Sequence, residues 1–285
     1  METLYIVDGS NLIYRGYYSS HSYSRKDKDG NCINGLYGLF SLLLKDVKLV
    51  KQYFNSNIDY FCVLFDIYPA TNRRNIYPQY KLNRKDNPDR KNIKRQMKIA
   101  KRLLNSLGIS VLYNTDGNEA DDLMASLALN FKGSVVISTT DKDLCQVVRK
   151  NVAILRKGEF ITNQNFYSVY GFKPSQFRDY LCLMGDNSDN VPGIYGVGPA
   201  KAKKIINEIG SISSFFNNVV KDEWYSDLLI NSKEILDLGS KLISLNIDSN
   251  LTVPRLSGIK VTAKSLFEHY NLLSFIDPFS IVLYE

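Results

Sequence analysis

The chain has 285 residues, of which 44% are hydrophobic, enough for one large domain or two closely joined ones. Only two histidines are present and no C-x-x-C pair, which argues against a zinc hydrolase, a zinc ribbon and a redox dithiol; the net charge is +7. The N-terminus lacks the features of a signal peptide and no apolar run is long enough to span a bilayer, so we expect a cytoplasmic protein.

The first half of the chain alternates short β-rich runs with helical stretches. Strands are predicted at Leu4–Val7, Tyr60–Phe65, Ser110–Tyr113, Ser134–Ser138 and Val152–Leu155. Helices are predicted at Leu36–Tyr53, Asp89–Leu107, Glu119–Asn130 and Leu144–Arg149. Because parallel strands are joined by crossover helices, this alternation predicts an α/β fold with a mostly parallel central sheet and helices on both faces.

The second half of the chain is predicted to be helical, because its strand signals are weak. This change of character places a domain boundary near residue 165, with an α/β core over 1–165 and a small all-helical region over 166–285. The helix candidates there are Asn163–Tyr170, Pro174–Met184, Ala200–Ile209, Ser213–Val219, Ser232–Leu245 and Ala263–Leu272.

Acidic residues follow three of the predicted strands. Asp8 follows the first strand, Asp66 the second, and Asp141 and Asp143 the Ser134–Ser138 strand. Because the carboxyl ends of parallel strands meet at one edge of a sheet, we expect these side chains to converge there. Two further groups, 119–122 and 186–189, have alternative explanations as acids at a helix N-terminus and as turn residues.

Nine acids are thus candidate metal ligands: Asp8, Asp66, Glu119, Asp121, Asp122, Asp141, Asp143, Asp186 and Asp189. Two carboxylates 4 Å apart repel by roughly 4 kcal/mol at an effective dielectric constant of 20, so gathering them requires counter-charge. Ligand sets made only of oxygen favour Mg²⁺ or Mn²⁺ over zinc. Two such ions are the usual arrangement for phosphodiester hydrolysis, which the sequence therefore predicts.

One segment, 73–102, accounts for the basic character of the chain. It holds twelve Lys or Arg and two Asp, a balance of +10, which leaves −3 for the remainder. Most charge runs are solvated helix faces, but this one has few acids for i,i+4 pairing and favours a polyanionic partner. The helical spacing places one row of lysines on a single face: Lys91, Lys94, Lys98 and Lys101.

A glycine-rich turn, Gly193–Lys204, leads into the helix predicted from Ala200. Glycines allow the backbone to approach a phosphate closely, and the first N–H groups of the helix can bind an anion. The turn does not fit a dinucleotide-binding Gly-x-Gly-x-x-Gly motif, because Lys201 replaces the last glycine and no strand precedes it.

Five motifs, in this order along residues 4 to about 210, resemble the bacterial and phage 5′-nuclease family, which includes flap endonucleases and the 5′-nuclease domain of bacterial DNA polymerase I. A departure lies at Asp66-Ile67-Tyr68-Pro69, where relatives often carry glycine after the acid, and we expect it to affect substrate fit but not metal binding. The motifs are Val7-Asp8-Gly9-Ser10-Asn11, Tyr77-Pro78-Gln79-Tyr80-Lys81-Leu82-Asn83-Arg84, Glu119-Ala120-Asp121-Asp122, Thr140-Asp141-Lys142-Asp143-Leu144 and Gly185-Asp186-Asn187-Ser188-Asp189-Asn190-Val191-Pro192-Gly193.

The resemblance implies a PIN-like nuclease core and a structure-specific 5′→3′ exonuclease and flap endonuclease that uses two Mg²⁺ ions, which Mn²⁺ can replace. It places Lys81 beside the developing negative charge on the phosphate, together with Arg84, and gives Arg73 the role of steering that phosphate. By the same resemblance the first ion would be held by Asp8, Asp66, Glu119, Asp121 and Asp122, and the second by Asp141, Asp143, Asp186 and Asp189.

The resemblance also implies how DNA is bound, and we expect a monomer whose partner is DNA with a 5′ single-stranded flap or end. The segment from about 83 to 107 would form an arch over the active site, in which the lysine row contacts successive phosphates of a threaded strand. Tyr80 would either stack on an unpaired base or lie in the core. A helix–hairpin–helix-like turn at about 185–210 would grip the duplex, with K⁺ on its carbonyls, through Gly196, Gly198, Lys201, Lys203 and Lys204.

Two alternatives remain open at this point. A PIN-type metal-dependent ribonuclease would use four or five of the acids, but it would need neither Asp186 and Asp189 nor the glycine-rich turn. A non-catalytic DNA-binding clamp would need none of the acids, which would then only repel one another.

Overall fold

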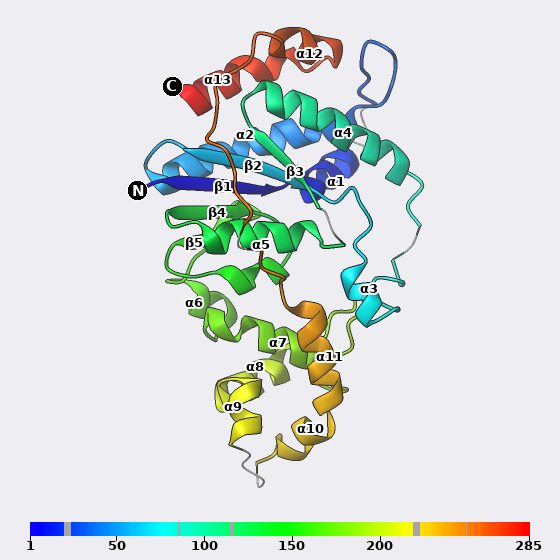
Figure 1. The fold of residues 1–285 in the computed structure, drawn as a ribbon, viewed down its shortest axis with the longest axis vertical. Helices are drawn as coiled ribbons and strands as arrows, with labels where there is room; N and C mark the ends of the chain where they lie inside the picture. The colour runs from blue at the N-terminus through cyan, green and yellow to red at the C-terminus, as the bar shows by residue number, and fades with distance from the viewer. Residues whose placement is uncertain (20–23, 85, 115–116, 219–222, 249) are drawn as a thin grey trace.

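The computed structural model describes residues 1–19, 24–84, 86–114, 117–218, 223–248 and 250–285. At its centre lies a six-stranded sheet of order β3-β2-β1-β4-β5-β6, in which only β6 is antiparallel to its neighbour, and this confirms the predicted α/β class (Figure 1). β6 has three residues, too few to leave an alternating pattern in the sequence. The strands are β1 (Thr3–Asp8), β2 (Tyr60–Phe65), β3 (Ser110–Tyr113), β4 (Ser134–Ser138), β5 (Val152–Arg156) and β6 (Glu159–Ile161).

The central strands are apolar throughout because both faces of the sheet are covered. In β1, Leu4 and Ile6 point into the core on one face, whereas Tyr5 and Val7 point into the core on the other. The first face is covered by α5 (Ala120–Asn130) and the short helix η1 (Asp143–Val147). The second face is covered by α1 (Gly9–Ser19), α2 (Asn34–Phe54) and α4 (Arg90–Ser106).

Helix α1 follows β1 directly and has no counterpart among the predicted helices. Two glycines and three tyrosines in eleven residues give it low helix propensity. It is held by packing on α2, where Gly16 meets Gly38 so closely that a Cβ on Gly16 would lie 2.6 Å from the Cα of Gly38. Tertiary contact therefore overrides local preference in this segment.

The region beyond the sheet is helical from residue 166 to 243, as predicted, and lies below the sheet in Figure 1. The last helix of this region, α11 (Lys233–Ile243), contacts helix α3 (Asn72–Ile76), which comes from the first half of the chain. The end of the predicted helix 213–219, Val219, falls outside the described residues. The elements are α6 (Phe166–Tyr170), η2 (Pro174–Gln176), α7 (Phe177–Met184), α8 (Pro199–Ile209), α9 (Ile212–Asn217), α10 (Ser226–Asn231) and α11 (Lys233–Ile243).

The C-terminal segment returns to the α/β core, which corrects the predicted single helical region 166–285. Helices α12 (Ala263–His269), η3 (Leu273–Phe275) and α13 (Ile276–Tyr284) lie beside α2 and α4 (Figure 1). The ring of Phe40 on α2 lies 5.1 Å from that of Phe267 and 5.9 Å from those of Phe275 and Phe279. Within the described residues, no helix combines the length and apolar character needed to cross a membrane.

Candidate active site

Three of the candidate acids lie at the carboxyl edge of the sheet, as their positions after strands predict. Asp8 ends β1, Asp66 follows β2 and Asp141 follows β4, and the register places these strand ends side by side. Asp8 is buried, and its two oxygens accept hydrogen bonds from the Asn11 N–H at 2.8 Å and the Thr139 hydroxyl at 2.9 Å. The first turn of α1 and the residue after β4 thereby fix the orientation of this carboxylate.

Helix α5 directs its N-terminus at the same edge. The N–H of Ala120, its first residue, donates to Asp66 Oδ1 at 2.8 Å, so the helix start and the end of β2 are tied together. An acid at this position also interacts favourably with the positive end of the helix dipole. Asp121 follows in the first turn, and burial, reinforced by the charges of Asp141, Asp8 and Asp66, raises its pKa.

The acids are close enough to perturb one another's ionisation. Burial, reinforced by the charges of Asp66 and Asp141, raises the pKa of Asp8 to about 7. Burial, reinforced by Asp141 and Asp186, likewise raises the pKa of Asp143 to about 7. Without a further cation, such a group of carboxylates is under electrostatic strain near neutral pH.

The site fits a hard divalent cation. Oxygen Oδ1 of Asp143 is buried and has no hydrogen-bond partner, although buried polar atoms are normally satisfied. Among the described residues, no three of the nine acids bring their oxygens within 4.8 Å of one another; the group that does, Asp27, Asp29 and His269, belongs to a hairpin loop and α12. Carboxylates spaced apart around a common region are what repulsion dictates in the absence of bound ions.

Asp186 and Asp189 lie in a tight loop below the sheet edge. Two backbone hydrogen bonds between Asp186 and Val191, of 2.9 and 2.8 Å, close the loop. Oxygen Oδ1 of Asp186 accepts from both the N–H and the hydroxyl of Ser188 at 2.7 Å, and Oδ2 lies 3.0 Å from the ammonium of Lys142. Although burial opposes the effect, these partners lower the pKa of Asp186, which is ionised and already compensated.

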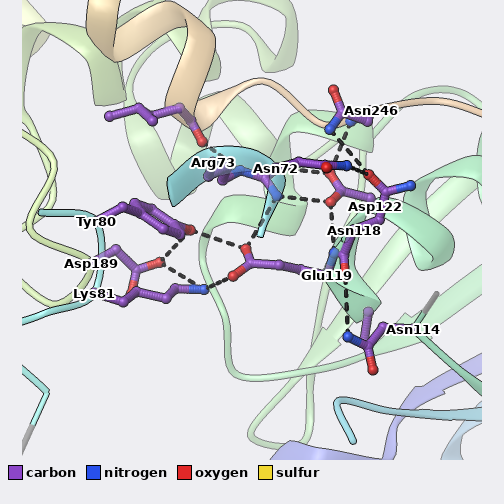
Figure 2. A network of polar contacts seen from close by, with 12 residues as sticks. Asn72, Arg73, Tyr80, Lys81, Asn114, Asn118, Glu119, Asp122, Asp189 and Asn246 are labelled. Carbon is purple, nitrogen blue, oxygen red and sulfur yellow. Dashed lines mark hydrogen bonds and ion pairs between the residues drawn. The ribbon is translucent and has the colours of Figure 1, made fainter. Parts of the chain in front are cut away.

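Lys81 lies among the acids, where the sequence places it (Figure 2). Its ammonium is hydrogen-bonded to Glu119 and lies 3.4 Å from Asp189 Oδ2. Burial opposes the positive charge, but Glu119 and Asp189 outweigh it and raise the pKa of Lys81. Arg84 is paired with the other oxygen of Asp189. Both predicted cations are thus positioned at the site by carboxylates.

Arg73 does not steer a phosphate in this structure, and that expectation is corrected. Its side chain is buried, and its five N–H groups are used by Asp122, Glu119 and the carbonyl oxygens of Leu242 and Ser244 (Figure 2). A guanidinium with no remaining donor cannot bind a ligand.

The expectation that Asp122 binds the first metal ion is corrected for the same reason, because its oxygens are already occupied by hydrogen bonds. Its oxygens accept from the two terminal nitrogens of Arg73 at 2.7 and 2.8 Å and from the backbone N–H groups of Glu119 and Asn246. Asp122 and Arg73 join α5, α3 and the chain after α11, and their role is structural.

Tyr80 lies in the core, which decides between the two roles left open for it. Its side chain is only 3% exposed, and its hydroxyl is 3.0 Å from Glu119 Oε2 and 3.2 Å from Asp189 Oδ2. It cannot stack on a base from this position. Instead it holds the two acids that also bind Lys81.

Replacement of Arg73 by methionine should lower the free energy of unfolding by about 3–5 kcal/mol, because Asp122 would be left as an uncompensated buried charge. Urea denaturation followed by circular dichroism measures this loss. Arg74→Met is the matched control, since Arg74 is exposed on the same helix and should change stability little. A loss below about 1 kcal/mol for Arg73→Met would contradict the structural role.

Helix α4 carries the predicted lysine row, of which Lys91, Lys98 and Lys101 are exposed. Lys94 differs, because its ammonium donates to the carbonyl oxygen of Ile67 at 2.6 Å. The opposite face of α4, from Ile93 to Leu104, is buried in the core. Residues 90–106 of the predicted arch therefore form a helix packed on the core, and the arch itself stays a prediction.

The glycine-rich turn presents an exposed tip on a buried base. Ile194 and Val197 are buried and joined by a 3.0 Å backbone hydrogen bond, whereas Tyr195 between them is 98% exposed. Gly196 has φ +73°, which favours glycine, and a Cβ on Gly198 would meet no atom within 4 Å. The backbone at Gly196 and Gly198 can therefore be approached closely by another molecule.

Helix α8 begins at Pro199, directly after the turn, and carries the predicted lysines. Lys203 and Lys204 are exposed and Lys201 is half-buried. The ammonium groups of Lys204 and Lys201 lie 4.7 and 5.9 Å from the ring of Trp224. The sequence does not predict a binding role for Trp224 or Tyr195, because a single aromatic residue outside a periodic pattern carries no local signal.

Comparisons with known proteins cover nearly the whole chain. Residues 3–171 match a family model described as the 5′-3′ exonuclease N-terminal resolvase-like domain, and residues 172–272 match the 5′-3′ exonuclease C-terminal SAM fold. A 5′-3′ exonuclease of Aquifex aeolicus is 36% identical over 256 residues, 88% of this chain and 84% of that protein. A DNA polymerase I of Mycobacterium tuberculosis is 35% identical over 83% of this chain, which spans only 27% of that protein.

Solved structures share the fold at low sequence identity. The bacteriophage T5 5′-exonuclease with bound zinc aligns with a TM-score of 0.67 and 20% identity, covering 99% of this chain and 98% of the other. The catalytic core of Rad2 in complex with a DNA substrate aligns with a TM-score of 0.59 and 18% identity, covering 98% and 92%.

Proposed function

The chain belongs to the 5′-3′ exonuclease family, and from this premise we propose that it is a metal-dependent nuclease that cuts DNA at 5′ ends and at 5′ single-stranded flaps. The observation that carries the proposal is the gathering of acids from three strand ends, from the start of α5 and from the 186–189 loop at one edge of the sheet. Two proteins of similar fold support a DNA substrate: a T5 flap endonuclease has been solved with DNA and metal ions, and the Rad2 catalytic core with a DNA substrate.

The ions that suit this site are Mg²⁺, two per site, with Mn²⁺ as a substitute, because all the candidate ligands are carboxylate oxygens. Bound there, they would supply an activated water and neutralise charge on the scissile phosphate. Asp8, Asp66 and Asp121 would hold the first ion, and the second would be held by Asp141, Asp143, Asp186 and Asp189.

Glu119 is better suited to positioning Lys81 than to binding an ion. One of its oxygens bonds the Lys81 ammonium, and the other accepts from Arg73 and Tyr80. The ammonium of Lys81 is thereby kept charged and fixed at the sheet edge, where it can stabilise negative charge on a phosphate in the transition state. The buried residues of Figure 2 would thus contribute to catalysis indirectly, by positioning the ammonium group of Lys81.

Duplex DNA is proposed to bind the turn 193–198 and the start of α8. Gly196 and Gly198 leave the backbone accessible, and Lys201, Lys203 and Lys204 supply positive charge beside it. Turn carbonyls would hold a K⁺ ion. This contact needs no base-specific group, which suits an enzyme that recognises a DNA structure rather than a sequence.

Cleavage of a 5′-labelled flap in Mg²⁺, with EDTA as the blank, tests the proposed function. We expect short labelled products from the flap and a slower release of nucleotides from a recessed 5′ end. A ribonuclease would cut a matched RNA and leave the DNA intact, and a non-catalytic clamp would bind the flap without cutting it.

Neutralising Lys91, Lys98 and Lys101 to glutamine should flatten the salt dependence of flap binding. Each lost contact with single-stranded DNA should reduce the slope by roughly 0.7, whereas binding of blunt duplex through the turn 193–198 should barely change. Titrations of both substrates over a range of salt concentrations measure the slopes.

The control for this prediction replaces Lys45, Lys48 and Lys51 of α2 by glutamine. These replacements change the net charge by the same amount, but on a different helix. An equal loss of slope on flap and duplex would make Lys91, Lys98 and Lys101 a general electrostatic surface and would contradict a specific contact of this row with single-stranded DNA.

A further inference from the structure

Lys142 is a cation of the site to which neither the motifs nor the proposed function assign a role. It lies in the loop after β4, between Asp141 and Asp143, which are proposed ligands of the second ion. Its ammonium does not bond either neighbour, but reaches across to the 186–189 loop and lies 3.0 Å from Asp186 Oδ2. It is the contact that joins the two halves of the second acid group.

Asp186 is fully satisfied in this arrangement. Its Oδ1 accepts from Ser188 twice and from the Asp189 N–H at 3.4 Å, and its Oδ2 accepts from Lys142. Asp143 shows the opposite, since its buried Oδ1 has no partner. The acids proposed to share one ion are therefore unequal: Asp186 is paired with Lys142 and Asp189 with Lys81 and Arg84, whereas Asp143 has a buried oxygen without a partner.

A divalent ion that uses Asp186 Oδ2 must compete with the ammonium for that oxygen. The side chain of Lys142 is 34% exposed, so the ammonium can move into water without becoming a buried unpaired charge. Lys81 differs in this respect, because its side chain is only 16% exposed and it contacts two acids, Glu119 and Asp189. A divalent cation can therefore displace the ammonium of Lys142 from its carboxylate, whereas displacement of Lys81 is disfavoured.

We propose that Lys142 is an exchangeable counter-ion of the second metal site, which neutralises Asp186 in the metal-free protein and leaves it when a divalent cation binds. The inference rests on the proposed function, because it requires that second site. Its consequence is that Lys142 stabilises the metal-free fold and at the same time weakens the binding of the second ion. A residue with only a structural role would do the first and not the second.

The test compares Lys142→Met with the wild-type protein, free of DNA. Titration calorimetry with Mn²⁺ should show the weaker dissociation constant fall on the order of tenfold, as expected when a charge-assisted hydrogen bond need not be broken. Unfolding in urea should show a lower stability than wild type without metal and a much smaller difference in saturating Mn²⁺. Lys142→Gln keeps a donor for Asp186 without the charge, and should give the same tighter binding if the methionine variant does not fold.

Two controls separate exchange from general electrostatics. Lys94→Met removes a cation whose charge acts on Asp66 but which is bonded to a carbonyl oxygen, and Lys142→Arg retains the pair with Asp186. Equal tightening by Lys94→Met and Lys142→Met, or an equal loss of stability with and without metal, would overturn the inference. A wild-type protein that neither binds Mn²⁺ nor is stabilised by it would instead overturn the proposed function.

Discussion

Asp186→Asn is expected to reduce turnover in Mg²⁺ by orders of magnitude while DNA affinity stays within a few fold. In the proposed binding mode, affinity comes from phosphate contacts on α4 and α8, whereas the lost carboxylate charge would belong to transition-state stabilisation. Asparagine keeps the oxygen that accepts from Ser188, so the loop closed by Asp186 and Val191 should be retained. The change therefore removes charge with little change of shape.

Single-turnover cleavage of a flap substrate measures the rate, and fluorescence anisotropy in EDTA measures the affinity. The single tryptophan, Trp224, reports on the fold of the helical region in the same samples. Asp237→Asn is the matched control, because Asp237 is an exposed acid on α11 and should leave both quantities unchanged. Near-normal turnover of Asp186→Asn would remove Asp186 from the active site.

Lys81→Ala should cost on the order of 2.7–4 kcal/mol in the chemical step, the range seen when an electrostatic stabiliser is removed from an active site. Glu119 and Asp189 hold the ammonium rigidly, so little reorganisation opposes its action on a phosphate. Single-turnover rates at saturating flap DNA isolate this step, and thermal denaturation detects any loss of stability from the two acids left behind.

Arg84→Ala provides the comparison for Lys81. Arg84 contacts only Asp189 among the acids, and its side chain is 57% exposed, so solvent screens its charge and we expect a smaller effect on the rate. An effect of Lys81→Ala confined to KM would make Lys81 a tether for the phosphate and not a stabiliser of the transition state.

Two elements show where local sequence was insufficient for the fold. Local sequence does not predict helix α1, because its glycines and tyrosines are poor helix formers. Its close contact with α2 through Gly16 and Gly38 depends on both helices together. Helix α12 lies within the predicted helix Ala263–Leu272, whereas α13 has no counterpart among the predicted helices, and no local pattern specifies which core receives their apolar side chains. They pack on Phe40, more than 200 residues earlier in the chain.

The sequence by itself determined the parallel sheet and the convergence of Asp8, Asp66 and Asp141, because apolar runs form buried strands and parallel strands end at one edge. Only the tertiary structure decided which charges neutralise one another. The family resemblance implies that Arg73 contacts the substrate and that Asp122 binds metal, yet the two side chains pair with each other and with the chain from Leu242 to Asn246. Ion pairing depends on distances of a few ångströms between segments far apart in sequence, and no local pattern contains those distances.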